Sequence, residues 1–260
     1  MHILLTNDDG VFAPGLLALA QSLQGIGELT IVAPDRNWSA SGHVKTMHRP
    51  LRVTETNLQD GTPALSTDGA PSDCVALALL GLVKKQIDLV VSGINPFPNV
   101  GHDVTYSGTV TAAMEATLSG LPGVAFSLDS NRTHTKPLDY EPAARVAATI
   151  VRQIHSAGLP NGTLLNVNVP YVPIEEMRGV AVTRQGQRVY RDALVEREDP
   201  RGRKYYWIGG DIPTGVPDEG TDFWALSEQK VSITPLMMNL TALDYLPVLE
   251  SLKLKIDPGD

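Results

Sequence analysis

Two adjacent carboxylates near the start of the chain could hold a metal ion. Asp8 and Asp9 follow a short apolar run and stand directly before Gly10. Successive side chains on a strand point to opposite faces, so the two carboxylates converge only if the chain turns there, which Gly10 permits. Paired carboxylates form a hard, oxygen-rich site that suits Mg²⁺ or Mn²⁺. An Asp-Asp pair before Gly is also an ordinary loop start, so the motif alone leaves both interpretations open.

A second polar segment, residues 33–43, could supply a further ligand. A hydroxyl such as that of Ser39 can add a neutral oxygen to a hard cation, but the spacing does not choose Ser39 over Ser41. The alternative is a plain surface loop with a turn at Asp35 and Arg36.

A third polar segment, residues 92–110, begins at an apolar run and ends at a helical pattern. Ser107 stands at the N-cap position, and Gly108 and Thr109 follow in the first turn. Free backbone N–H groups and the positive end of a helix dipole bind phosphate without a lysine. Such a helix start would let the chain bind an anion although its formal net charge is −8. The alternative is that Ser107 only caps the helix, and this structural role is compatible with phosphate binding at the same helix start.

The elements that must position these residues alternate along the first half of the chain. Short apolar runs rich in branched residues alternate with helical patterns, which is typical of βαβ units and a parallel sheet, and hence of an α/β fold. In such sheets the ligand lies beyond the carboxyl ends of the strands, and all three polar segments follow predicted strands. The predicted strands span 3–6, 29–33, 51–55, 64–67, 87–91 and 124–128, and the predicted helices 14–23, 74–83, 108–118 and 142–154. Residues 93–107 are predicted as an irregular loop.

Beyond about residue 170 the composition changes to Tyr, Trp, Gly and Pro, with short β-like runs at 180–183, 205–208 and 231–234. We therefore predict a catalytic core over 1–170 and a β-rich C-terminal region over 171–260, closed by a helix at 241–253. Between Arg184 and Lys204 seven basic residues, Arg191 among them, mix with four acidic ones. This segment is interpreted as a solvated hairpin arm or subunit contact, with anion binding as the alternative.

Composition excludes several classes of protein. Hydrophobic residues make up 42% of the 260 residues and charged residues 19%, which excludes disorder, collagen and a coiled coil. No apolar run approaches the roughly 18 residues of a membrane span, and the single cysteine, Cys74, favours a reducing compartment. We therefore expect a cytoplasmic protein without a membrane partner. The net negative charge argues against a stable nucleic-acid partner.

Taken together, the motifs resemble those of the SurE survival-protein family of nucleotidases. They run in order along the chain as Asn7-Asp8-Asp9-Gly10, Ala33-Pro34-Asp35-Arg36-Asn37 with Ser39, Ser92-Gly93-Ile94-Asn95, Tyr106-Ser107-Gly108-Thr109-Val110, Thr221-Asp222-Phe223 and Ser232-Ile233-Thr234-Pro235-Leu236. The resemblance implies a metal-dependent phosphatase that releases phosphate from nucleoside 5′-monophosphates, with 3′-monophosphates and short polyphosphate as further substrates. It implies one divalent cation per subunit, Mg²⁺ or Mn²⁺, held by Asp8, Asp9, Ser39 and Asn95.

The resemblance also implies where phosphate binds and how the molecule assembles. Asn99, Ser107, Gly108 and Thr109 match the phosphate-side positions of the family. The fold implied is a Rossmann-like core with C-terminal arms exchanged between subunits, as a homodimer or homotetramer. Pro96-Phe97 and His102 depart from the family pattern at the mouth of the site, where they bear on substrate preference more than on metal binding.

The expected mechanism is in-line attack by a metal-activated water. A bound cation can lower the pKa of its water to roughly 7 to 9, and Asp9 is the candidate proton acceptor beside Asp8. One rival is a phosphatase with an aspartate nucleophile, but Asn7 occupies that position and cannot form an aspartyl phosphate. A rival from another class is a nucleotide-binding sensor or assembly protein without turnover.

Overall fold

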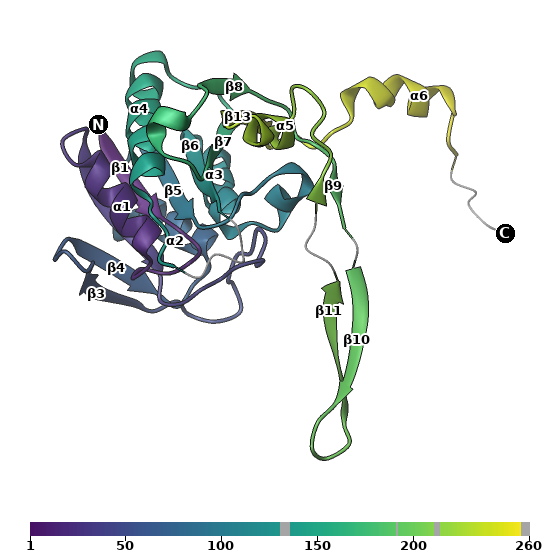
Figure 1. Cartoon of the computed structure of the whole chain (residues 1–260), viewed down its shortest axis with the longest axis horizontal. Coiled ribbons are helices and arrows are strands. Elements are labelled where there is room, and N and C mark those ends of the chain that lie inside the picture. The colour runs from purple at the N-terminus through teal and green to yellow at the C-terminus, as the bar shows by residue number, and fades with distance from the viewer. Residues whose placement is uncertain (131–135, 191, 211–213, 256–260) are drawn as a thin grey trace.

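A nine-stranded sheet forms the body of the molecule in this computed structural model, which describes residues 1–130, 136–190, 192–210 and 214–255. The strand order is β3-β4-β2-β1-β5-β6-β7-β13-β8 (Figure 1). The strands are β1 (His2–Thr6), β2 (Glu28–Pro34), β3 (Val53–Asn57), β4 (Pro63–Thr67), β5 (Leu89–Asn95), β6 (Gly123–Asp129), β7 (Thr163–Pro170), β8 (Val180–Val182) and β13 (Val231–Met237). All neighbours from β4 to β7 are parallel, while β3 and β13 pair antiparallel with β4 and β7. The predicted α/β fold with a mostly parallel sheet is confirmed.

Helices cover both faces of this sheet. Helices α1 (Pro14–Leu23) and α4 (Glu141–Ala157) pack together on one face, and α2 (Pro71–Leu77) and α3 (Gly108–Leu118) on the other. Alternate residues of β1 face opposite sides, so Ile3 lies in the apolar cluster under α1 and α4, whereas Leu4 lies in the cluster under α2 and α3. The sheet therefore has an apolar core on each face, which is why its strands are almost uniformly apolar.

The predicted helix starts match the structure where the sequence carries a capping signal. Helix α1 begins at Pro14, whose fixed backbone suits the first helical position. Helix α3 begins at Gly108, because the hydroxyl of Ser107 accepts a hydrogen bond from the Val110 amide at 3.2 Å.

Strand β5 was predicted to end at residue 91, but it continues to Asn95. The predicted irregular loop at 93–107 is therefore wrong at its start. Gly93 lies so close to β6 that a Cβ atom on it would stand 2.4 Å from the carbonyl oxygen of Phe126. The glycine that suggested a loop instead allows two strands to approach each other.

The predicted buried helix at 74–83 is wrong in its second half. Helix α2 starts earlier, at Pro71, and gives way after Leu77 to a π-helical turn over Ala78–Leu82. In that turn Gly81 has φ +118° and Leu80 is 83% exposed. A glycine with positive φ ends the regular helix, so the apolar run does not stay buried.

The C-terminal third adds projections as well as sheet strands. A hairpin of β10 (Asp192–Glu198) and β11 (Lys204–Gly210) extends away from the body, beyond a short pair of β9 (Arg188–Val189) with β12 (Thr214–Gly215) (Figure 1). The predicted hairpin arm is thus present, although Arg191 lies outside the described residues. Helix α5 (Asp222–Ser227) packs on β13, and α6 (Leu246–Ser251) lies on a segment that leaves the body. Strands β8 and β13 belong to the main sheet, which therefore draws on both predicted regions.

Within the described ranges, the structure has no helix long and apolar enough to cross a bilayer.

Candidate active site

The three polar segments meet where β1 and β5 end side by side. These strands are parallel neighbours, with Thr6 paired to Ser92. Helix α1 follows β1 on one face and α3 follows β5 on the other, so the chain leaves the two strands in opposite directions and opens a crevice. Adjacent strands lie about 4.8 Å apart. Asp8, two residues beyond Thr6, and Asn95, three beyond Ser92, therefore lie at the same edge of the sheet.

Asp8 lies against the first turn of α3. It is 4% exposed, and its Oδ1 accepts a hydrogen bond of 2.5 Å from the hydroxyl of Thr109. A Cβ atom on Gly108 would stand 2.6 Å from the Cβ of Asp8, so only glycine fits there. Burial raises the pKa of Asp8, while the Thr109 hydroxyl and the amides of Thr109 and Gly108 lower it. The helix start predicted to bind phosphate therefore faces the first predicted metal ligand.

Asp9 is half-buried beside Asp8. Its Oδ1 accepts a hydrogen bond from Asn37 Nδ2 at 3.0 Å. Burial first, and the charge of Asp8 second, raise the pKa of Asp9 to about 7, against the lowering effect of Asn37. Two neighbouring carboxylates that resist ionisation together gain from a divalent cation, which neutralises both.

The residues present fit a hard cation. Within the described residues no three His, Cys, Asp or Glu side chains converge, so a metal at this edge would have two carboxylates and complete its shell with neutral oxygens. Hydroxyl and amide oxygens together with carboxylates are what Mg²⁺ and Mn²⁺ accept.

Asn7 shapes the turn that brings the carboxylates together. Its side chain donates to the Gly10 carbonyl at 3.0 Å and accepts from the Gly10 amide at 3.2 Å. Gly10 has φ +102°, and a Cβ there would stand 3.3 Å from the carbonyl carbon of Arg36. The side chain of Asn7 thus holds this turn through Gly10. As a carboxamide it lacks the carboxylate that an aspartate nucleophile would supply.

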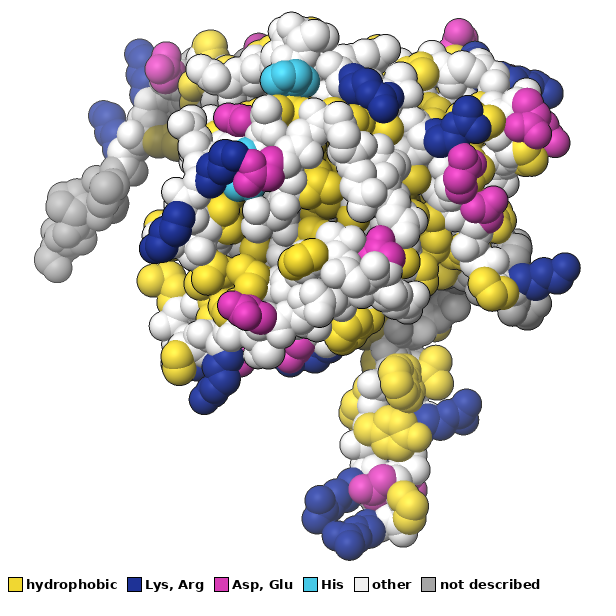
Figure 2. Space-filling view, turned by 90° about the vertical axis from the view of Figure 1, so that its left-hand side faces the viewer, with side chains coloured by type: hydrophobic (Ala, Val, Ile, Leu, Met, Phe, Trp, Pro, Cys, Tyr) yellow, Lys and Arg dark blue, Asp and Glu magenta, His cyan; other side chains and the backbone are white. Residues whose placement is uncertain are grey.

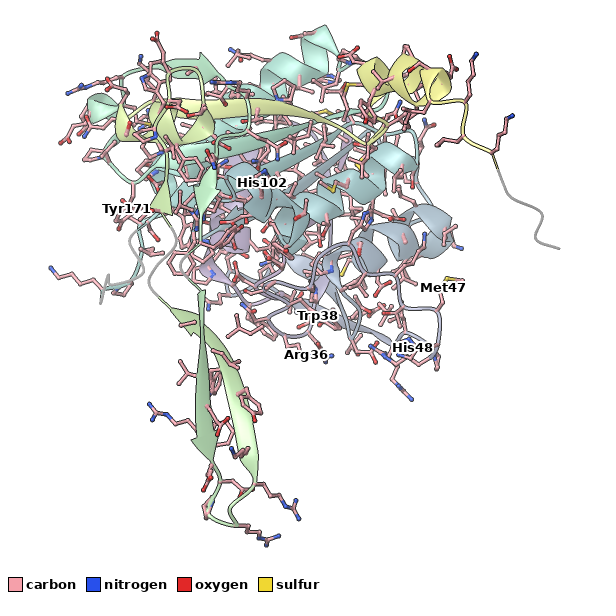
Figure 3. The ribbon with its side chains drawn as sticks, turned by 90° about the vertical axis from the view of Figure 1, so that its right-hand side faces the viewer. Arg36, Trp38, Met47, His48, His102 and Tyr171 are labelled. Atoms are coloured by element: carbon pink, nitrogen blue, oxygen red, sulfur yellow. The ribbon has the colours of Figure 1, made fainter. Side chains whose placement is uncertain are left out.

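The segment with Ser39 is attached directly to Asp8. The Trp38 amide donates to the Asp8 carbonyl at 2.7 Å, and the Gly42 amide donates to the Tyr106 carbonyl at 2.9 Å. Arg36 stacks on the Trp38 ring at 4.8 Å, and Figure 3 shows both side chains at the same edge of the molecule. Ser39 is exposed next to Trp38. Its assignment as a ligand in preference to Ser41 stays a prediction.

Asn95 and Asn99 follow β5 with different surroundings. Asn95 Nδ2 donates to the Phe97 carbonyl at 2.5 Å, which leaves its carboxamide oxygen as the atom suited to a cation. Asn99 Nδ2 donates to the hydroxyl of Ser127 at 2.7 Å. The Asn99 amide donates to Oδ1 of Asn168, and the Asn99 carbonyl accepts from the side-chain amides of Asn166 and Asn168. Asn99 is thus part of a buried polar network, and its contact with phosphate stays a prediction.

The partners of Asn99 in that network were not predicted from the sequence. Ser127, Asn166 and Asn168 are fully buried on β6 and β7. Polar residues at inward positions of a strand must find hydrogen-bond partners, and Asn166 and Asn168 stand in such alternation with apolar residues. That pattern is the signal that could have identified them.

A further buried carboxylate, Asp222, joins three segments beside the site. It accepts hydrogen bonds from the amides of Gly101 at 2.7 Å, Gly186 at 2.8 Å and Phe223 at 2.9 Å, and it is fully buried. The sequence assigned it no role of its own. It holds the 3-10 helix Gly101–Thr105, which carries His102 (Figure 3). The position of His102 at the mouth of the site stays a prediction.

The candidate ligands lie at an open edge of the sheet. A cavity of about 760 Å³ lies between α4 and the strands β8 and β13, and one of about 650 Å³ lies beside the π-helical turn after α2. Neither includes Asp8 or Asn95.

The fold is a Rossmann-like α/β fold, and the two adjacent carboxylates and the buried start of α3 lie together at its switch point. The family model for Survival protein SurE matches residues 3–192. The 5′-nucleotidase SurE of Herpetosiphon aurantiacus is 53% identical over 245 residues, which cover 94% of this chain and 95% of that protein. The 5′-nucleotidase SurE of Geobacter sulfurreducens is 50% identical over 251 residues, 96% of this chain and 93% of that one.

A solved structure agrees with these sequences. The crystal structure of the Sure protein from Aquifex aeolicus matches with a TM-score of 0.82 at 38% identity, and the match covers 98% of this chain and all of that one. The chain belongs to the SurE family. The resemblance inferred from the motifs is confirmed.

Proposed function

We propose that this chain is a metal-dependent phosphatase that hydrolyses nucleoside 5′-monophosphates to nucleoside and phosphate. Family membership supports the enzyme class, because relatives about 50% identical over nearly the whole chain are named 5′-nucleotidase SurE. We extend the proposal to one Mg²⁺ or Mn²⁺ per subunit, and to 3′-monophosphates and short polyphosphate as further substrates.

One observation carries the metal dependence: the buried Asp8 carboxylate lies at the start of α3, where Thr109 donates to it. A phosphate at that helix start and an ionised Asp8 repel each other in a low-dielectric site. A cation held by Asp8 would attract both groups and so remove this repulsion. Burial raises the pKa of both Asp8 and Asp9, so the ionised pair would also gain from a neutralising cation.

The roles proposed for the residues follow from their positions. Asp8 and Asp9, with the oxygens of Ser39 and Asn95, hold the cation, which supplies charge for the phosphoryl oxygens and a more acidic water. The half-buried Asp9 carboxylate accepts the proton of the attacking water. Gly108 and Thr109 in the first turn, beside the cap Ser107, stabilise charge on the phosphoryl group, and Asn99 lies on the phosphate side.

Three further expectations belong to the proposal. The substrate is a small nucleotide, with no stable nucleic-acid or membrane partner, and the protein acts in the cytoplasm. The subunits assemble as a homodimer or homotetramer. The alternative function is a nucleotide-binding sensor or assembly protein, which would bind the same ligands without releasing phosphate.

The test compares the unaltered chain with Asp8→Asn. We expect Mn²⁺-dependent phosphate release from AMP, GMP and UMP, loss of release with a chelator, and a fall in kcat/KM of at least about 100-fold for D8N with an unchanged circular dichroism spectrum. The matched control is Asp60→Asn, an exposed carboxylate in the loop between β3 and β4. The same assay with 3′-AMP and short polyphosphate decides the wider substrate range. Near-normal turnover by D8N contradicts the metal assignment, and nucleotide binding without release supports the sensor.

A further inference from the structure

The segment 37–46, here called the ligand loop, reaches the site from outside the sheet. Its first part is attached to Asp8 through the amide of Trp38, and its last part is attached to α2, where Asp73 accepts hydrogen bonds from the Thr46 amide at 2.8 Å and the Thr46 hydroxyl at 2.7 Å. Figure 3 shows Trp38 and Met47 along one edge of the molecule, which marks the course of this loop. The exposed Ser39 lies between these attachments.

A buried carboxylate on α3 holds the middle of the ligand loop. Glu115 is 5% exposed, and its two oxygens bind two different loop side chains. His43 Nε2 lies 2.9 Å from Oε2, and Lys45 Nζ lies 3.0 Å from Oε1. Hydrogen bonds to an ionised group are about twice as strong as neutral ones, and the buried carboxylate would lack compensation without them.

Helix α3 connects this contact to the phosphate side of the site. Its first turn contains Gly108 and Thr109 beside Asp8, and Glu115 lies six residues beyond Thr109, which is about 9 Å along a helix. The part of the helix between them is almost entirely buried, so it cannot shift without disturbing the core. Helix α3 therefore contacts Asp8 at its start and the ligand loop further along.

We propose that Glu115 is a positioning residue, which through His43 and Lys45 fixes the ligand loop so that Ser39 is held at the cation site beside Asp8. The inference rests on the proposed function and names a residue outside the site on which metal affinity depends. Asp73 holds Thr46 independently, and backbone hydrogen bonds hold Trp38 and Gly42. Neutralising Glu115 therefore removes the anchors of the His43 and Lys45 side chains and loosens the ligand loop, while these other attachments persist.

The experiment measures Mn²⁺ affinity and loop protection in Glu115→Gln. A glutamine can accept from only one of the two donors and turns a donor of its own toward the other. We expect the Kd for Mn²⁺ to rise about tenfold, with faster amide hydrogen exchange in residues 38–45 and unchanged exchange in β1 and β5. The matched control is Glu141→Gln, which alters an exposed i,i+4 pair with Arg145 on α4, on the opposite face of the sheet from α3.

A second set of variants separates the contact from general loss of stability. Lys45→Met should weaken Mn²⁺ binding less than E115Q, Lys45→Arg should restore it, and the double variant E115Q/K45M should be no worse than E115Q alone. Unchanged Kd and unchanged exchange in E115Q, or additive effects in the double variant, would overturn the inference. A lack of Mn²⁺ binding by the unaltered chain contradicts the proposed function instead, because loop exchange in E115Q still decides whether Glu115 holds the loop.

Discussion

Asp9 lies half-buried beside Asp8, and its charged form is unfavourable for two physical reasons. Burial removes solvation from the carboxylate, and Asp8 adds a like charge, so the pKa rises from 3.8 to about 7. The folded chain therefore binds more protons than the unfolded chain between these values. By linkage, the free energy of unfolding therefore falls as the pH rises through this window. The destabilisation by Asp9 is complete above about pH 7 and absent below pH 3.8.

The pH dependence of Asp9→Asn follows from that sign. At pH 8 in a chelator we expect the variant to be more stable than the unaltered chain, by about 1 kcal/mol after allowance for solvent screening, or about 2–4 °C in Tm. Near pH 4 the two should melt together. Thermal melts at both pH values check this, with Asp244→Asn, an exposed carboxylate in the C-terminal segment, as the control. With Mn²⁺ present the order should reverse, because only the unaltered chain gains from the cation.

The sequence predicted individual residues where a local rule applied and missed them where partners are distant. Ser107 was recognisable as a cap because its partner, Val110, lies three residues away. Glu115 was not, because His43 lies 72 positions away and nothing in the helical pattern distinguishes a buried glutamate from an exposed one. Asn99 shows the same limit, since its network partner Asn168 lies 69 positions away.

At the scale of elements, Asp222 joins three segments that lie far apart in the sequence. Its carboxylate accepts from the amide of Gly101 in the 3-10 helix, from Gly186 in the segment before β9, and from Phe223 in α5. These three segments lie outside the strands of the main sheet. A carboxylate that satisfies three buried amides replaces the backbone pairing that a sheet would supply.

Asp222→Asn should therefore destabilise the chain although it changes only one atom. The amide group of asparagine keeps one acceptor oxygen and turns a donor toward the donor of Gly101. We expect a loss of about 1–3 kcal/mol, which lowers Tm by about 2–4 °C for each kcal/mol in a chain of this size. Asp244→Asn, an exposed carboxylate in the C-terminal segment, is the control, and equal Tm values for the two variants would contradict the role of Asp222.

Element limits were predictable where turn chemistry marks them and not where glycine has two meanings. Pro14 and Ser107 opened α1 and α3 at the predicted positions. Gly93 and Gly81 were harder, because one lies within a strand and the other ends a helix. At Gly93 the missing side chain lets two strands approach closely, whereas at Gly81 it permits the positive φ that ends the helix. The sequence around a glycine does not show which of these two effects applies.

At the scale of the whole molecule, two projections expose apolar side chains that the body does not cover. On the hairpin Ile208 is 86% exposed and Leu194 is 71% exposed, and Figure 2 shows hydrophobic and basic side chains along it. On the C-terminal segment Leu240 is 90% exposed and Leu254 is 76% exposed. Contiguous apolar surface of this kind marks contact sites in soluble proteins, which supports the proposed homo-oligomer.

The C-terminal segment gives the sharper test of assembly because it lies beyond the last strand of the sheet. Removing residues 240–260 leaves β13, which ends at Met237, intact. We expect the unaltered chain to sediment at two or four times 27.9 kDa, and the shortened chain at a lower multiple, because about 25 cal/mol of association free energy is lost per Å² of apolar surface removed. Leu246→Asp combined with Leu249→Asp should act like the truncation, whereas Glu250→Gln on the same helix should not. A monomeric unaltered chain, or identical masses for all variants, would contradict assembly through this segment.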